Sequence, residues 1–192
     1  TASQVFEVPL ESVTSTMRRN AKAVNFGIIY GISEFGLAKN IKTTSYKARE
    51  YIKTYFEKYP EVKEYMDKNV AFAKENGYSV TLLKRKRFIP ELLSSNYMLR
   101  QFGERVAMNM PLQGSAADVI KLAMLGVHKR LKAQNLKSKL ILQVHDELNF
   151  NVPLNEVDKV REIVVSEMQN VVHLTVPLIA DCGVGKNWLE AH

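Results

Sequence analysis

The chain has 192 residues, with 27 lysines and arginines against 20 acidic residues and a single cysteine. An apolar fraction of 46% excludes a disordered chain, one cysteine excludes an internal disulfide, and no apolar run has membrane-spanning length. Residues 1–105 carry 18 basic against 11 acidic residues, whereas residues 106–192 carry 9 of each. A basic half beside a neutral half favours a polyanionic partner, with nucleic acid as the leading candidate.

The first half of the chain is predicted to be almost entirely helical, because apolar residues recur there at helical spacing between capping residues. Gly31 is expected to stop the first helix, and Gly77 to cap the third. A small hairpin follows around the basic cluster KRKR. The predicted elements are helices at 14–30, 45–59 and 60–76 and strands at 78–83 and 87–89.

The second half is predicted to contain helices packed against a small antiparallel sheet. A long helical region is expected to be bent or broken near Pro111 and Gly114. The predicted elements are helical segments at 92–134 and 154–171 and strands at 140–144, 148–152 and 176–181. No linker separates the halves, so the fold class is α+β, with two subdomains of one unit.

The first predicted helix carries two separate faces. Met17, Ala21, Val24 and Ile28 form an ordinary core stripe, and a second file recurs every four residues away from it. Two cations and two aromatic rings in line span roughly 18 Å of helix, about the length of a nucleoside triphosphate. The cations could hold its phosphates and the rings could pack on its sugar and base. A solvated face is the alternative for the cations alone. The file consists of Arg18, Lys22, Phe26 and Tyr30.

A polar file in the long helix has the same spacing of four residues. Arg105, Asn109 and Gln113 lie beside the apolar stripe of that helix. Plain surface is the alternative interpretation for these side chains. Arginine and amide side chains can reach sugar oxygens and minor-groove acceptors, which all base pairs share. The file therefore predicts contact with a duplex of any sequence.

The stretch LILQVHDELNFNVP places a polar break between two alternating apolar runs, which is the signature of a hairpin. Asp146 and Glu147 are predicted at its tip. The break lacks the Asn-Gly or Asp-Gly pair that relaxed two-residue turns prefer. Carboxylates on a rigid hairpin can bind Mg²⁺, which takes substrate phosphates as further ligands. A solvated turn is the alternative, and the tip alone does not decide between the two.

Together these motifs resemble the C-terminal part of the polymerase domain in family A DNA polymerases of the bacterial polymerase I type. RRNAKAVNFGIIYG resembles motif B of the fingers, and LILQVHDELNFNVP resembles motif C of the palm. MPLQGSAAD and GVGKNWLEAH also resemble family segments, so the likeness covers essentially the whole chain. Lys84 departs from the family, which usually has Gly at that place in the fingers hairpin.

The resemblance implies a role for each matching residue. Asp146, Glu147 and Lys22 would be catalytic, and the two carboxylates would be metal ligands. Phe26 would pack on the sugar of the incoming dNTP, and Tyr30 would guard the template side of the nascent pair. The expected dNTP-binding residues are Arg18, Lys22, Phe26 and Tyr30, and the expected DNA-binding residues are Arg105, Asn109, Gln113, Gln143 and His145.

The resemblance also implies a function: nucleotidyl transfer from a dNTP to a primer 3′-hydroxyl in DNA replication or repair. Residues 1–100 would belong to the fingers and residues 101–192 to the palm. The cofactor would be Mg²⁺ in a two-metal site with one principal carboxylate outside this chain. The partners would be primer-template DNA, dNTPs and a missing N-terminal part of the polymerase with motif A and the thumb. A membrane would not be a partner. The setting would be the cytoplasm of a bacterium, at the nucleoid. The chain alone is expected to be inactive, and a non-catalytic nucleic-acid-binding module is the alternative.

Overall fold

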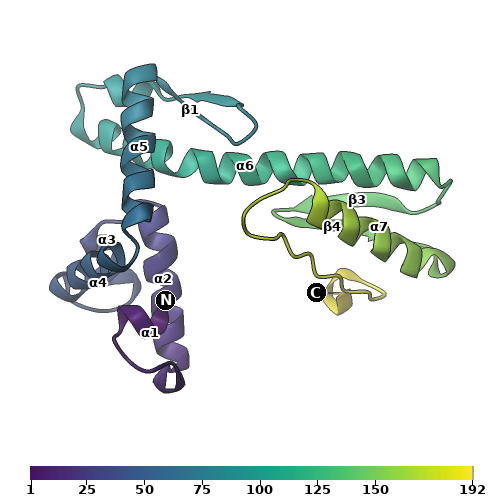
Figure 1. The fold of residues 1–192 in the computed structure, drawn as a ribbon, viewed down its shortest axis with the longest axis horizontal. Helices are drawn as coiled ribbons and strands as arrows, with labels where there is room; N and C mark the ends of the chain where they lie inside the picture. The colour runs from purple at the N-terminus through teal and green to yellow at the C-terminus, as the bar shows by residue number, and fades with distance from the viewer. Residues whose placement is uncertain (192) are drawn as a thin grey trace. The chain divides into compact units, whose positions relative to one another are not determined.

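A computed structural model describes residues 1–191, which form a mostly helical fold with two small antiparallel sheets (Figure 1). The predicted α+β class is therefore confirmed. The chain divides into two compact units, Thr1–Gly114 and a second that starts at Ser115. The predicted subdomain boundary at residues 100 and 101 lies somewhat earlier, and the assignment of fingers and palm stays a prediction.

The first unit begins with five helices, three of which the sequence predicted. Thr14 starts the second helix, because its Oγ1 accepts a hydrogen bond from the backbone N–H of Met17 at 3.2 Å. Gly77 caps the fifth helix as expected. The helices are α1 (Ala2–Val5), α2 (Ser15–Ile29), α3 (Glu34–Asn40), α4 (Ser45–Lys58) and α5 (Pro60–Asn76), with the short 3-10 helix η1 (Leu10–Ser12) before α2.

The main core of this unit lies among α1 to α4. The apolar stripe of α2 is buried there, and Tyr55 of α4 donates a hydrogen bond from its hydroxyl to Asn25 Oδ1 at 2.7 Å. Burial raises the pKa of the Tyr55 hydroxyl. One face of α2 is thus fixed against α4, which leaves its other face for solvent. The buried residues are Val5, Val24, Ile28, Leu37, Ala38, Ala48 and Tyr55.

A second, smaller core lies under the predicted basic hairpin. Its strands are β1 (Tyr78–Val80) and β2 (Lys86–Phe88), paired so that Ser79 faces Arg87. Lys84 adopts a φ of +67° in the turn, a left-handed conformation that glycine adopts more readily than other residues. The 3-10 helix η2 (Pro90–Leu93) follows the hairpin. The buried residues of this core are Ala73 of α5, Ile89, Leu92 of η2 and Ala107 of the next helix.

The long helix α6 (Tyr97–Ala133) starts later than predicted and is continuous. Residues 92–96 lie outside it because η2 occupies the preceding segment. Of the two predicted outcomes near Pro111 and Gly114, a break is wrong, since Pro111 lies inside the helix, and a bend stays a prediction. A proline removes one hydrogen bond from the helical ladder, and here the hydroxyl of Ser79 donates a hydrogen bond to the Ala107 carbonyl instead.

The second unit contains the predicted hairpin and the helix that covers it. The elements are β3 (Lys139–Val144), β4 (Glu147–Asn151), the 3-10 helix η3 (Leu154–Glu156), α7 (Val157–Asn170) and α8 (Trp188–Ala191). The register has a bulge at Ile141, between the pairs of Leu140 and Leu142. The C-terminal part of α6, together with α7 and β4, buries Val127, Leu131, Val160, Ile163 and Val164.

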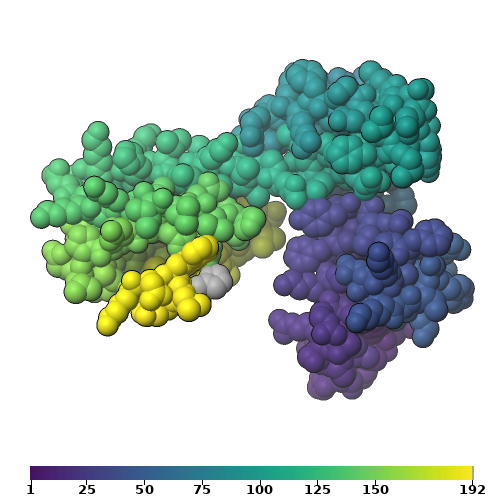
Figure 2. Space-filling model, turned by 180° about the vertical axis from the view of Figure 1, so that it is seen from behind, coloured from purple at the N-terminus to yellow at the C-terminus, as the bar shows by residue number. Residues whose placement is uncertain are grey.

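The strand predicted at 176–181 does not form. Alternating apolar residues make a strand only where a neighbouring strand pairs with them. Among residues 1–191, β3 and β4 pair only with each other. Val176 and Ile179 of this segment are more than 70% exposed. The end of the chain that follows it, yellow in Figure 2, lies at the surface of its unit. The prediction was therefore wrong because the pattern found no partner.

Candidate nucleotide and nucleic-acid site

The polar file of α2 lies on an exposed face, as the sequence predicted. Phe26 and Tyr30 are 47% and 45% exposed, whereas Val24 and Ile28 of the core stripe are at most 2% exposed. Arg18 and Lys22 are also exposed, and the Lys22 Nζ lies 5.8 Å from the centre of the Phe26 ring. Two large rings that are about half exposed beside two exposed cations leave this face of the helix accessible to a ligand.

The end of α2 is fixed by a left-handed glycine. Gly31 has a φ of +68°, and its N–H donates to the Ile28 carbonyl at 2.8 Å. The N–H of Ile32 donates to the Gly27 carbonyl, also at 2.8 Å, which completes a Schellman motif. A Cβ at Gly31 would lie 2.8 Å from Arg105 Cγ, closer than such contacts occur. The Arg105 side chain therefore packs directly on the end of α2.

The structure brings two residues of the α6 file to the Tyr30 end of the α2 file. Gln113 donates from Nε2 to the Tyr30 hydroxyl at 3.3 Å, and Arg105 packs on Gly31. Asn109 lies between them on α6 and is half-buried. A cleft of about 700 Å³ opens beside this junction. Its lining includes Phe26, Tyr30, Ser33, Gln101 and Arg105.

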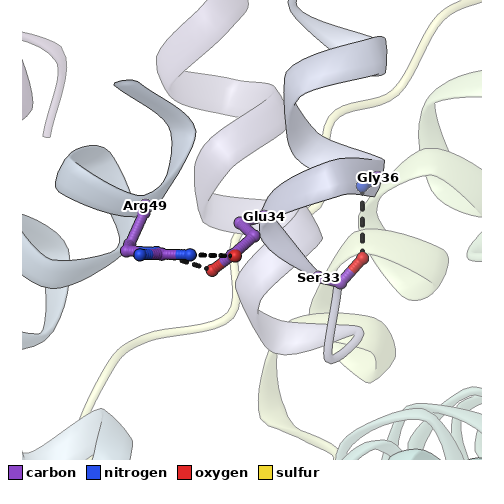
Figure 3. A network of polar contacts seen from close by, with 4 residues as sticks. All are labelled: Ser33, Glu34, Gly36 and Arg49. Carbon is purple, nitrogen blue, oxygen red and sulfur yellow. Dashed lines mark hydrogen bonds and ion pairs between the residues drawn. The ribbon is translucent and has the colours of Figure 1, made fainter. Parts of the chain in front are cut away.

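The loop beyond Gly31 is held by polar contacts that sequence reasoning missed (Figure 3). Ser33 Oγ accepts from the Gly36 N–H at 3.2 Å and so caps α3. Arg49 of α4 donates to both carboxylate oxygens of Glu34, at 3.0 and 2.5 Å. The hydrogen bond from Arg49 lowers the pKa of the Glu34 carboxyl. These contacts fix the start of α3 at the wall of the cleft.

The hairpin of the second unit has a two-residue turn, one position earlier than predicted. His145 and Asp146 form the turn, whereas Glu147 is the first residue of β4 and pairs with Val144. The prediction that Glu147 shares the tip is corrected on this point. The reason is that His145 accepts a φ of +51°, a conformation that costs a non-glycine residue of order 1 kcal/mol.

The backbone of this turn is held by a neighbouring side chain. Gln143 donates from Nε2 to the His145 carbonyl at 2.9 Å. Asp146 is exposed and Glu147 half-buried, so two adjacent carboxylates stand at one end of the sheet. Among residues 1–191 no group of three acidic, histidine or cysteine side chains could enclose a metal ion. Two carboxylates fit a hard cation that keeps its waters and substrate ligands, as Mg²⁺ does.

A third carboxylate, Glu156, supports the hairpin and was missed from the sequence. It accepts hydrogen bonds from the backbone N–H groups of Lys137 and Ser138 at 3.0 Å each, and from Ser138 Oγ at 2.6 Å. The backbone hydrogen bond from Lys137 is the main cause that lowers the pKa of Glu156. This carboxylate anchors the segment that enters β3, and no sequence pattern marks it.

Comparison with known proteins gives the family to which the chain belongs. The profile of DNA polymerase family A matches residues 1–190, and the chain belongs to this family. It is 55% identical over 190 residues to DNA polymerase I of Caldicellulosiruptor bescii and 49% identical over 191 residues to that of Geobacillus stearothermophilus. These two matches span 99% and 100% of this chain, but the chain spans only 22% of the length of either relative.

A solved structure matches the chain closely as well. The polymerase domain of Pol1 from M. smegmatis, in complex with DNA primer-template and dNTP, is 42% identical with a TM-score of 0.94. The match covers 99% of this chain and 34% of that one. None of the helices in residues 1–191 has the length and apolar content to cross a bilayer. Membership of family A generally implies use of a divalent metal.

Proposed function

We propose that this chain is the fingers and part of the palm of a DNA-templated DNA polymerase acting in replication or repair at the bacterial nucleoid. Residues 1–100 form the fingers and residues 101–192 the palm part. The observation that carries the proposal is the exposed file on α2, where two cations and two rings stand apart from the core stripe. The family match and the solved relative with bound primer-template and dNTP support it.

The α2 file binds the incoming dNTP along its length. Arg18 and Lys22 hold the triphosphate, because charge-assisted hydrogen bonds to phosphate are the strong ones. Lys22 also neutralises the charge that develops on the leaving pyrophosphate, which makes it catalytic. Phe26 packs on the sugar, and Tyr30 stands at the template side of the nascent pair beside the cleft.

The hairpin supplies the metal ligands. Asp146 is the principal ligand and Glu147 the secondary one, in keeping with the position of Glu147 in β4. Bound Mg²⁺ would supply neutralisation of charge on the phosphate oxygens and activation of the attacking hydroxyl. The reaction joins the primer 3′-oxygen to the α-phosphorus of the dNTP and releases pyrophosphate.

The DNA-binding residues come from both units. Arg105, Asn109 and Gln113 of α6 contact the duplex near the nascent pair, through groups shared by all base pairs. His145 and Gln143 contact the primer terminus from the hairpin. The hydrogen bond between Gln143 and the His145 carbonyl supports this arrangement, because it orders the turn that carries Asp146.

The chain alone is expected not to extend a primer. A two-metal site needs further carboxylate ligands, and residues 1–191 offer no third ligand beside Asp146 and Glu147. We place the missing carboxylate, with the thumb, in a longer protein, in keeping with the 22% of its relatives that this chain spans.

The test is templated primer extension by the longer protein that contains this chain, with Mg²⁺. Lys22→Ala is expected to raise the KM for dNTP and lower kcat/KM at least tenfold. Lys58→Ala is the matched control, because Lys58 ends α4, which packs on the opposite face of α2. Equal effects of the two variants on kcat/KM would contradict the assignment of the dNTP site to α2. Binding of primer-template without extension by the wild type would favour the non-catalytic module.

A further inference from the structure

The hairpin β1–β2 and its turn contact α6 at two places, one on either side of Pro111. Pro111 lies inside α6 and has no N–H, so the Ala107 carbonyl lacks the donor that position 111 normally supplies. The hydroxyl of Ser79, in β1, donates to that carbonyl at 3.4 Å. Ser79 is only 2% exposed, so this polar side chain is buried at the one place in the helix where a proline leaves a carbonyl to be satisfied.

The same hairpin contacts α6 a second time, seven residues further along. Arg85 donates from Nη2 to the Gly114 carbonyl at 3.0 Å. Thr81 packs against Gly114 so closely that a Cβ there would lie 2.6 Å from Thr81 Cγ2. Thr81 Oγ1 in turn accepts from the Arg85 N–H at 3.1 Å, which ties the turn to the strand.

The two contacts bracket the residues proposed to bind the duplex. Asn109 and Gln113 lie between Ala107 and Gly114, in the segment whose hydrogen-bond ladder Pro111 interrupts. An interrupted helix is prone to bend at the proline, and bending would move these two side chains relative to each other. The hairpin fastens both ends of the segment and so fixes their spacing.

We propose that Ser79 and Arg85 are positioning residues, which hold the Asn109–Gln113 segment of α6 in the geometry that reads the primer-template duplex. This inference rests on the proposed function, because it presumes that Asn109 and Gln113 contact DNA. The role proposed for Arg85 rests on its hydrogen bond to a backbone carbonyl of α6.

The experiment is a double-mutant cycle in the longer protein, read as the Kd for a primer-template duplex and as the KM for dNTP. Ser79→Ala and Arg85→Ala are each expected to raise the duplex Kd about three- to tenfold, the effect of losing one hydrogen bond. The KM for dNTP should change less than twofold, because Arg18 and Lys22 lie on α2. Arg87→Ala removes the same charge from the same hairpin and serves as the control. Its duplex Kd should be at least threefold lower than that of Arg85→Ala.

The cycle separates positioning from general destabilisation. In an Asn109→Ala background, Ser79→Ala is expected to add less than a twofold change in Kd, because the side chain that it positions is gone. Additive effects, or equal effects of Arg85→Ala and Arg87→Ala, would overturn the proposal and leave the polymerase function standing. If Asn109→Ala left the Kd unchanged, the proposed duplex contact and this inference would fall together. Arg85→Lys keeps a donor and should recover part of the affinity.

Discussion

The junction between α2 and α6 can be tested by adding one methyl group at Gly31. A left-handed conformation costs alanine about 1–2 kcal/mol, partly offset by the lower entropy of its unfolded chain. At Gly31 the new Cβ would also lie 2.8 Å from Arg105 Cγ and 3.2 Å from Met108 Cε. Displacing those atoms has the usual overpacking cost of about 1–3 kcal/mol. Gly31→Ala is therefore expected to lower the free energy of unfolding by roughly 2–4 kcal/mol.

Gly77 offers a control that isolates the contact with Arg105. Its φ of +77° imposes the same backbone strain, but an added Cβ would meet nothing within 4 Å. Gly77→Ala is therefore expected to cost only about 1 kcal/mol. The assay is urea unfolding of the chain followed by circular dichroism, with the duplex Kd of the longer protein as a second measurement. Equal destabilisation by the two variants would refute the packing of Arg105 on the end of α2.

Two further changes address the sugar contact and the support of the hairpin. Phe26→Tyr should sharply reduce discrimination against dideoxynucleotides, because the tyrosine hydroxyl can replace the hydrogen bond of the missing 3′-hydroxyl, worth about 0.5–1.5 kcal/mol. The ratio of kcat/KM for deoxy and dideoxy substrates measures this discrimination. An unchanged ratio would place Phe26 away from the sugar. The lowered pKa of Glu156 means that its stabilisation is full above the ordinary carboxyl pKa and is lost as the pH falls through the lowered value. Glu156→Gln should therefore lower stability at neutral pH and approach the wild type in acid, whereas a pH-independent difference between their unfolding curves would contradict this account.

The local elements were predictable where a strong periodic pattern lay between residues that cap or end a helix. The helix at 14–30 was marked by its threonine cap, its two faces and Gly31, and its structure agrees within one residue at either end. The predicted separation of its exposed file from its core stripe is confirmed. The short helix α3 was missed, because seven residues contain less than two full apolar repeats.

The errors came from contacts between segments distant in the sequence. The break at Pro111 was expected from local preference, but β1 and the following turn supply hydrogen bonds to α6 on both sides of it. The strand at 176–181 has the right pattern and no partner among the residues that the structure describes. Glu156 was not predicted as an anchor, because glutamate is common at the start of a helix. Its role follows only from the structure, where its carboxylate oxygens accept hydrogen bonds from the N–H groups of Lys137 and Ser138.

The central claim is that Asp146 at the hairpin turn binds the catalytic metal, and a single-turnover measurement tests it most directly. The longer protein, preloaded with primer-template, would be mixed with one correct dNTP and Mg²⁺, for the wild type and for Asp146→Asn. The substitution keeps the size of the side chain and removes the charge that a hard cation needs. The account predicts that the rate of incorporation falls at least a thousandfold, about 4 kcal/mol in barrier, while the Kd for primer-template changes less than threefold. A near-normal rate in Asp146→Asn would make the hairpin tip an ordinary solvated turn and contradict the account.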